Sequence, residues 1–189
     1  MTLRVRQVGL SRRRFLGASA TSALAVALGL PAAHADDLPT PARWIELFNT
    51  HTSDTLRVVY RSATGFVPAA LERLQWVLRD HRANESAPID PQLFDQLHAF
   101  AATAGVEPRY QIISGYRSPH TNAALAAAGR GVARQSLHMQ GRAVDVRLQG
   151  VPCDVLRDAA LAAACGGVGY YPASDFVHLD TGRVRAWSG

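Results

Sequence analysis

Two histidines and one aspartate in this sequence are of the types, and at the spacing, that could together bind a metal ion. His138 and Asp145 lie in the stretch Ser136–Asp145, and His178 follows later, in Asp175–Asp180. On neighbouring strands, these side chains would supply two imidazoles and one carboxylate and leave a fourth ligand position open. Three protein ligands with one open position are typical of a catalytic zinc site rather than a structural one.

The chemistry expected of such a site is amide hydrolysis. Zinc lowers the pKa of a bound water toward about 7 and polarises a carbonyl group. A nearby carboxylate must take the water's proton and pass it to the leaving amine, and Asp175 and Asp180 are the two candidates. Arg117, just after a predicted strand, is placed to direct a cationic donor at the carbonyl oxygen. The alternative for this arginine is a surface ion pair.

Two predicted strands must position these groups. Residues 141–148 alternate valine and leucine with other residues, so Asp145 faces away from the apolar side. His138 lies in the loop just before this strand. Residues 176–180 form a later strand in which His178 shares a face with Phe176 and Asp180. We therefore expect the ligands to come from the sheet and from one adjoining loop.

The remaining pattern predicts an α+β fold: a single domain with a mostly antiparallel sheet that carries the metal ligands and is flanked by helices. Asp90 and Pro91 are typical of a helix start, and Gly105 of the end of that helix. The other expected elements are a hairpin of strands 43–48 and 55–60, helices 68–82, 121–128 and 154–164, strands 110–113 and 168–171, and an edge strand over 182–187.

Residues 1–35 have the pattern of an export signal. Five arginines precede a short apolar run, and Ala33-His34-Ala35 is a small-x-small cleavage pattern. Ser11–Gly17 resembles the twin-arginine signal. We expect cleavage after Ala35, a lead-in over 36–42, a domain over 43–189, a periplasmic location and no stable membrane insertion after cleavage. The alternative is an uncleaved anchor, which the shortness of the apolar run disfavours.

The charge balance disfavours nucleic acid as a partner. The whole chain has 20 basic and 15 acidic residues, but all five basic residues of 1–35 would leave with the signal. The remaining 154 residues would carry no net charge, and they contain no basic cluster dense enough to follow a phosphate backbone. We expect a monomer.

The two cysteines and His51 are not expected to bind the metal. Cys153 and Cys165 lack CxxC spacing. They flank a predicted helix that would hold them about 18 Å apart, whereas a disulfide needs Cα atoms within about 7 Å. We expect buried free thiols, with a disulfide as the alternative. His51 lies in a predicted turn, where a capping or surface role is expected.

The motif resembles a known enzyme family. Ser136-x-His138-x-x-Gly141-x-Ala143-x-Asp145, followed by His178, is similar to the zinc D-Ala-D-Ala carboxypeptidases and murein endopeptidases, whose fold is shared by the hedgehog signalling domain. Ser114–Ser118 resembles the family's arginine loop on the substrate side. The stretches Leu47–Thr52 and Phe176–Gly182 resemble one exported branch, long catalogued as a domain of unknown function.

The resemblance implies one zinc ion on His138, Asp145 and His178, and Arg117 near the substrate carbonyl. Tyr116 and Ser136 are expected beside the substrate as well, and the substrate class would be the stem peptides of peptidoglycan. The family's general base is usually a glutamate three residues before the last histidine. Asp175 holds that place here and is one methylene shorter, so Asp180 remains the alternative base.

Three hypotheses follow. The first is a zinc peptidase that cuts peptidoglycan stem peptides or cross-links, with the choice between endopeptidase and carboxypeptidase left open. The second is a non-catalytic zinc- or peptidoglycan-binding envelope domain, suggested by the short candidate base. The third, a structural envelope domain with a coincidental motif, predicts no bound metal.

Overall fold

The computed structural model describes residues 41–129 and 132–189. The predicted export signal therefore lies outside the described residues, as does most of the lead-in. Within these residues there are eight strands: β1 Arg43–Asn49, β2 Thr55–Ser62, β3 Gly65–Phe66, β4 Arg109–Ser114, β5 Ala143–Leu148, β6 Gly167–Tyr171, β7 Phe176–Asp180 and β8 Arg185–Ser188. The helices are α1 Pro68–Val77, α2 Pro91–Thr103, α3 Pro119–Ala127 and α4 Cys153–Ala163, with the short 3₁₀ helices η2 Leu137–Gln140 and η3 Pro172–Ser174.

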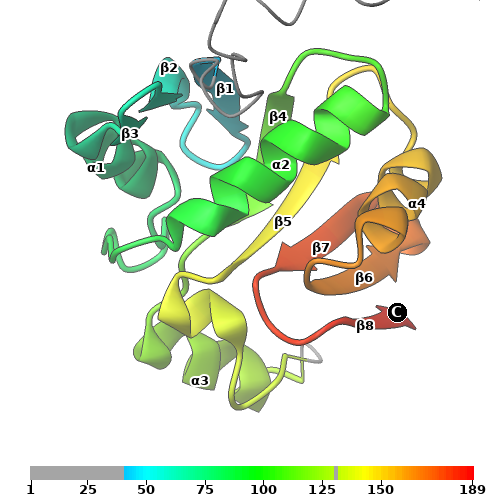
Figure 1. The fold of residues 1–189 in the computed structure, drawn as a ribbon. Coiled ribbons are helices and arrows are strands. Elements are labelled where there is room, and N and C mark those ends of the chain that lie inside the picture. Colours follow the sequence, from blue (N-terminus) through cyan, green and yellow to red (C-terminus); the bar gives the residue numbers. More distant parts are fainter. Residues whose placement is uncertain (1–40, 130–131) are drawn as a thin grey trace, which may run out of the picture. The chain divides into compact units, whose positions relative to one another are not determined.

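All eight strands join one sheet in the order β3-β2-β1-β4-β5-β7-β6-β8 (Figure 1). Neighbouring strands are antiparallel except in the pairs β1–β4 and β6–β8, which are parallel. The predicted α+β class with a mostly antiparallel sheet is confirmed. The predicted hairpin is also present as β1 and β2, and β8 is an edge strand.

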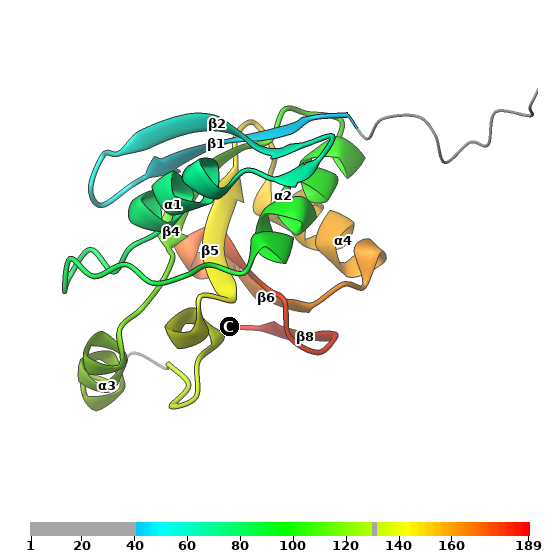
Figure 2. The ribbon, with the colours of Figure 1, turned by 60° about the vertical axis from the view of Figure 1, so that its left-hand side comes forward.

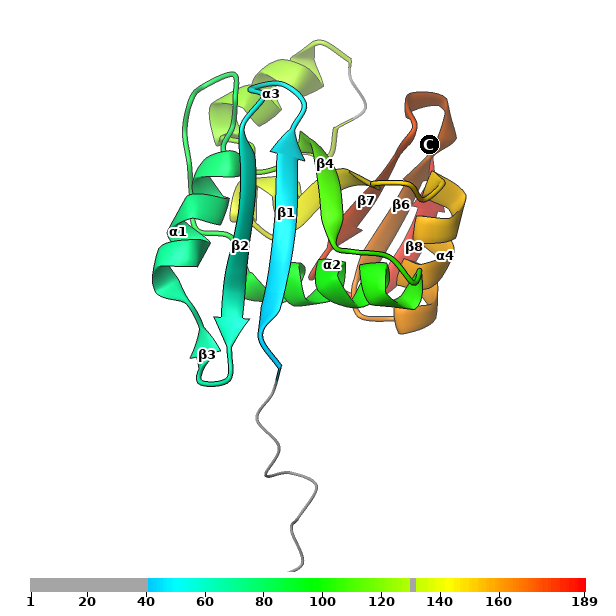
Figure 3. The same ribbon diagram turned by 90° about the horizontal axis from the view of Figure 1, so that it is seen from above.

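Helices α1, α2 and α4 cover one face of this sheet, and the core fills the space between. Apolar residues of α1, α2 and α4 join Val144, Val146 and Leu148 of β5 in one buried cluster. Figure 2 shows α1 and α2 on the same side of β1 and β2, and Figure 3 gives the same arrangement seen from above. Because side chains alternate along a strand, Asp145 lies on the opposite face, away from these helices.

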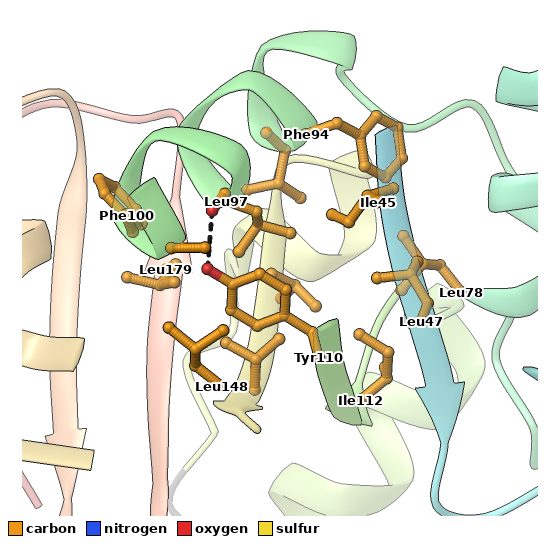
Figure 4. Packing of buried hydrophobic residues seen from close by; sticks show 14 of the residues in the cluster. Ile45, Leu47, Leu78, Phe94, Leu97, Phe100, Tyr110, Ile112, Leu148 and Leu179 are labelled. Atoms are coloured by element: carbon orange, nitrogen blue, oxygen red, sulfur yellow. Dashed lines mark hydrogen bonds between the residues drawn. The ribbon is translucent and has the colours of Figure 1, made fainter. Parts of the chain in front are cut away.

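A buried tyrosine ties the central helix to the sheet. Tyr110 of β4 is only 2% exposed, and its hydroxyl donates a hydrogen bond of 2.7 Å to the carbonyl of Leu97 in α2 (Figure 4). The bond satisfies a polar group that would otherwise be costly to bury. Burial also raises the pKa of the Tyr110 phenol. As predicted, α2 begins with an N-cap, since the side chain of Asp90 accepts a hydrogen bond from the backbone N–H of Gln92.

The prediction that the first helix runs to about Arg82 is wrong, because α1 ends at Val77. The buried carboxylate of Asp80 accepts hydrogen bonds from the backbone N–H groups of Arg82, at 3.0 Å, and Ser118, at 2.9 Å. These bonds hold the chain in a turn and attach it to the start of α3. Leu78 still belongs to the apolar stripe and residues 79–82 contain no glycine or proline, so the pattern alone does not reveal this stop.

The thiol prediction is only partly correct. Both cysteines are free, as expected, and Cys153 is buried, but Cys165 is exposed. The reason is its position just after α4, where Ala164 adopts a left-handed conformation and directs the chain away from the helix. No helix in the described part of the chain has the length and apolar character needed to cross a membrane.

His51 lies in the turn between β1 and β2, and its side chain is exposed. Its ring stacks on that of His81 with centroids 4.0 Å apart, and its Nε2 lies 3.1 Å from the carbonyl oxygen of Ile113. Among the described residues it belongs to no group of three or more metal-binding side chains.

Protonation of Asp80 should weaken the fold at acid pH. Burial raises the pKa of this carboxyl, but hydrogen bonds from Thr121, Ser118 and Arg82 outweigh that effect and lower the pKa to about 2. A group whose pKa is lowered on folding stabilises the fold above its unfolded value and loses that contribution as pH falls through the folded value. We therefore expect Asp80→Asn to lower the free energy of unfolding by roughly 2 kcal/mol at pH 7.

Urea titrations of the parent and of Asp80→Asn between pH 7 and pH 2 measure this difference. We expect it to shrink as pH falls from about 4 to about 2, because the parent carboxyl then becomes neutral. A difference that stays constant over this range would contradict the assignment.

Candidate metal centre

His138 is positioned by a short helix with a cap at each end. Ser136 precedes η2, and its hydroxyl accepts a hydrogen bond of 3.3 Å from the backbone N–H of His138. Gly141 follows at φ +65°, and a Cβ there would lie 2.0 Å from the carbonyl oxygen of Pro88. This close approach in a left-handed conformation requires glycine.

One ring nitrogen of His138 is already engaged. Nδ1 lies 2.7 Å from the carbonyl oxygen of Gly115, in the loop after β4. A carbonyl oxygen can only accept, so Nδ1 must carry the proton and the neutral ring keeps its lone pair on Nε2. The Gly115 carbonyl thus selects the tautomer of His138 that can bind a cation.

His178 is prepared in the same way by Asp180. Its Nε2 lies 3.0 Å from Oδ2 of Asp180. An ionised carboxylate only accepts hydrogen bonds, so Nε2 carries the proton and the lone pair of the neutral ring is on Nδ1. The antiparallel pairing of β5 and β7 places His178 directly opposite Asp145.

Three electron-pair donors therefore converge on one point. Oδ1 of Asp145 lies 2.8 Å from Nδ1 of His178 and 3.3 Å from Nε2 of His138, and the two nitrogens are 3.2 Å apart. Tetrahedral ligands at the usual zinc distances of about 2.0–2.1 Å are about 3.3 Å from one another. The donor set and its spacing therefore fit a metal ion. All three residues are buried, and they form a group able to hold one.

The pKa shifts of Asp145 and His178 show that this group favours a positive charge at its centre. Burial raises the pKa of Asp145, but the charges and hydrogen bonds of His138 and His178 outweigh burial and lower it below its usual range. Burial also lowers the pKa of His178, yet its hydrogen bonds to Asp145 and Asp180 raise the net value to about 9. In the metal-free chain a proton on His178 therefore neutralises part of the carboxylate charge, and a bound cation would replace it.

Asp180 lies behind His178 and not in the cavity. Its side chain is fully buried, and Oδ1 accepts hydrogen bonds from the backbone N–H groups of Gly167, at 3.0 Å, and Gly182, at 2.8 Å. Oδ2 accepts from His178 and, at 2.6 Å, from Arg185. Burial raises the pKa of Asp180, but these hydrogen bonds outweigh it and lower the pKa below its usual range. With both oxygens engaged and no exposure, Asp180 is placed to orient His178, which does not fit the alternative role of general base.

Asp175, the other candidate base, is not among the residues that line the cavity. Its side chain is 71% exposed, and Oδ2 lies 3.1 Å from Nε of Arg147. Asp175 caps the C-terminal end of η3 with a left-handed backbone (φ +50°). Its side chain therefore does not follow the alternation of the extended strand β7, which begins at the next residue. The structure therefore does not bring this expected residue together with the three candidate ligands.

Arg117 is buried beside the site, so it does not form the surface ion pair considered as the alternative. Its guanidinium donates to the side chains of Asn122 and Ser114, each at 3.3 Å. Its Nε has no hydrogen-bond partner among the described residues. Burial lowers the pKa of Arg117, and the charge of Asp145 opposes that shift. The backbone N–H of Arg117 donates to the carbonyl of His138, which joins the arginine loop to the metal-binding loop.

A cavity of about 520 Å³ opens at these groups. Tyr116, expected beside the substrate, does not line it, because its ring packs against the hydrophobic core instead. Ser136 does line it, as do four residues that the sequence did not single out, from β6, β7 and β8. The lining side chains are Arg117, Val132, Ala133, Gln135, Ser136, Leu137, His138, Asp145, Tyr171, Phe176, His178, Arg185 and Trp187.

Comparisons with known proteins agree on one family. The model of the family described as peptidoglycan L,D-endopeptidase MepK matches residues 38–187. The peptidoglycan L,D-endopeptidase MepK of Escherichia coli K12 is 43% identical over 171 residues, which cover 86% of this chain and 94% of that protein. The probable peptidoglycan L,D-endopeptidase MepK of Haemophilus influenzae is 40% identical over 152 residues, covering 80% of this chain and 81% of that protein. No solved structure matches. These matches confirm the resemblance to murein endopeptidases noted from the metal-binding motif, and the chain belongs to the peptidoglycan L,D-endopeptidase MepK family.

Proposed function

We propose that this protein is a zinc-dependent endopeptidase that hydrolyses peptide cross-links of peptidoglycan. The observation that carries the proposal is the convergence of three potential ligand atoms on the wall of an open cavity, in a chain of the MepK family. The names of the relatives support an amide between an L-centre and a D-centre as the bond that is cut. The substrate also supports a location in the cell envelope, with export through the signal over residues 1–35.

The residues of the site would share the work as follows. His138, Asp145 and His178 would hold the zinc ion, which supplies Lewis acidity and an activated water when bound. Arg117, whose side chain lines the cavity, would bind the substrate carbonyl oxygen and stabilise the negative charge that develops on it. Asp180 would keep His178 in the tautomer and orientation that bind the metal. Ser136 would act by capping η2 and so fixing His138.

Asp175 remains the proposed general base, although its side chain pairs with Arg147. Its side chain is exposed and its neighbour Phe176 lines the cavity, so Asp175 would have to leave the ion pair with Arg147 to act there. Asp145 is the one carboxylate among the lining residues, and it is a candidate ligand. This observation favours a second candidate function, a zinc-containing domain that binds peptidoglycan peptides without cutting them.

We expect His138→Ala to abolish both stoichiometric zinc binding and the release of peptides from purified sacculi, because it removes one of three ligands. Elemental analysis and mass spectrometry of the released muropeptides measure the two effects. His51→Ala is the matched control, since His51 is an exposed histidine outside the ligand group. Full zinc content with undiminished lysis in His138→Ala would remove the site assignment.

We expect Asp180→Asn to weaken zinc binding by about 10- to 100-fold, because the amide no longer fixes the tautomer of His178. Competition with a chelator measures the affinity, and circular dichroism checks that the fold is intact. Unchanged zinc affinity combined with a large fall in kcat would mean that Asp180 takes part in proton transfer during catalysis and does not orient the ligand His178.

We expect Asp175→Asn to lower kcat by about 100-fold or more at full zinc occupancy, as is usual when a general base is removed. Asp158→Asn, at an exposed aspartate of α4 paired with Arg157, is the control and should leave kcat unchanged. If Asp175→Asn has parental activity, another group is the base. If the parent itself binds muropeptides but cuts none, the binding function is the correct one.

A further inference from the structure

Tyr171 lies at the end of β6 and lines the cavity, yet the proposed chemistry does not use it. The strand order β4-β5-β7-β6 places the strands of Asp145 and His178 between Tyr171 and the loop that carries Arg117. The two residues therefore flank the metal group from opposite sides. Arg117 is already the donor on one side, and Tyr171 is the corresponding polar group on the other.

The ring of Tyr171 is held in place from several directions. It stacks on Phe176, with centroids 4.6 Å apart and planes inclined by 19°. A Cβ on Gly189 would lie 2.4 Å from the ring, so the backbone at this glycine comes as close as it can. Trp187 of β8 donates a hydrogen bond of 2.9 Å from its indole nitrogen to the Tyr171 hydroxyl oxygen. A side chain fixed in this way has little rotamer freedom left to lose when it contacts a ligand.

The hydrogen bond from Trp187 decides what the Tyr171 hydroxyl can still do. Indole N–H is a donor only, so the phenol oxygen acts as the acceptor in this contact. The phenol proton then points elsewhere, and no described residue accepts it. Tyr171 therefore presents an unused donor from the wall of the cavity.

The residues that hold the Tyr171 hydroxyl in place also contact the metal group. The ring of Trp187 lies 5.1 Å from that of His178, and a Cβ on Gly169, opposite His178 in the sheet, would lie 2.5 Å from the Trp187 ring. The guanidinium of Arg185 lies 4.9 Å above the same indole and also binds Asp180. The strand that carries Trp187 thus braces Tyr171 and the ligand His178 together.

We propose that the Tyr171 hydroxyl donates a hydrogen bond to a peptide oxygen of the substrate, on the side of the metal group opposite Arg117. Trp187 is the positioning residue that directs this donor. The inference rests on the proposed function for the identity of the ligand as a peptidoglycan peptide. Peptide carbonyls and carboxylates are acceptors only, so a donor at this place is complementary to them.

The experiment measures Tyr171→Phe, which removes the hydroxyl and keeps the ring. With a cross-linked muropeptide isolated from sacculi, we expect kcat/KM to fall about tenfold, the usual scale for one hydrogen bond to a bound ligand. Zinc content should not change. Tyr170→Phe is the matched control, because Tyr170 is the neighbouring tyrosine of β6 but packs against the core and under Arg157. A tenfold loss in this control, or no loss in Tyr171→Phe, overturns the inference.

A second comparison separates contact with the substrate from mere support of Trp187. In a Trp187→Phe background, Tyr171→Phe should still lower kcat/KM severalfold if the hydroxyl contacts the substrate. If Tyr171 only holds the indole, it should have no further effect there, and the inference fails.

Binding of the same muropeptide to chelator-treated protein, measured by calorimetry, distinguishes failure of this inference from failure of the proposed function. A parent that binds but does not cut, with affinity tenfold weaker in Tyr171→Phe, retains the inference and rejects the peptidase. If the parent cuts the muropeptide and Tyr171→Phe cuts it equally well, the proposed peptidase is retained and the inference about Tyr171 is rejected. A parent that neither binds nor cuts rejects both.

Discussion

The site depends on the antiparallel register of β5 and β7, which sets Asp145 directly opposite His178. A shift of one residue in this register would turn His178 toward the helices and Val177 toward the cavity. The valines and leucines on the other face of the two strands prevent such a shift, because each is buried in the core. The hydrophobic pattern of the sheet thus fixes the position of two of the three candidate ligands.

Hydrogen bonds outside the ligand group determine how its members are protonated. The carbonyl of Gly115 holds the proton of His138 on Nδ1, and the carboxylate of Asp180 holds that of His178 on Nε2. In their neutral forms, which bind a metal, both rings therefore turn a lone pair toward Asp145. Such a concentration of electron pairs in a buried place is unfavourable without a cation, and this is the physical reason to regard the cluster as a metal centre.

Much of this arrangement could be predicted from the sequence. The alternation in residues 141–148 placed Asp145 on the face away from the valines, and the spacing of His178 and Asp180 put both on one face of the next strand. Local sequence patterns did not predict the features that depend on contacts between residues distant in the sequence. The end of α1 depends on Asp80 binding the N–H of Ser118, and the place of Asp175 depends on a left-handed turn. Trp187 and Arg185 reach the cavity only because β8 pairs in parallel with β6, which no local pattern indicates.

X-ray absorption at the zinc edge tests the central claim most directly, because it reports the atoms bound to the metal in solution. For the zinc-loaded protein the account predicts four nitrogen or oxygen neighbours at about 2.0–2.1 Å, with the outer-shell scattering of two imidazole rings. Sulfur neighbours at about 2.3 Å, a single imidazole, or a chain that retains no zinc would contradict it.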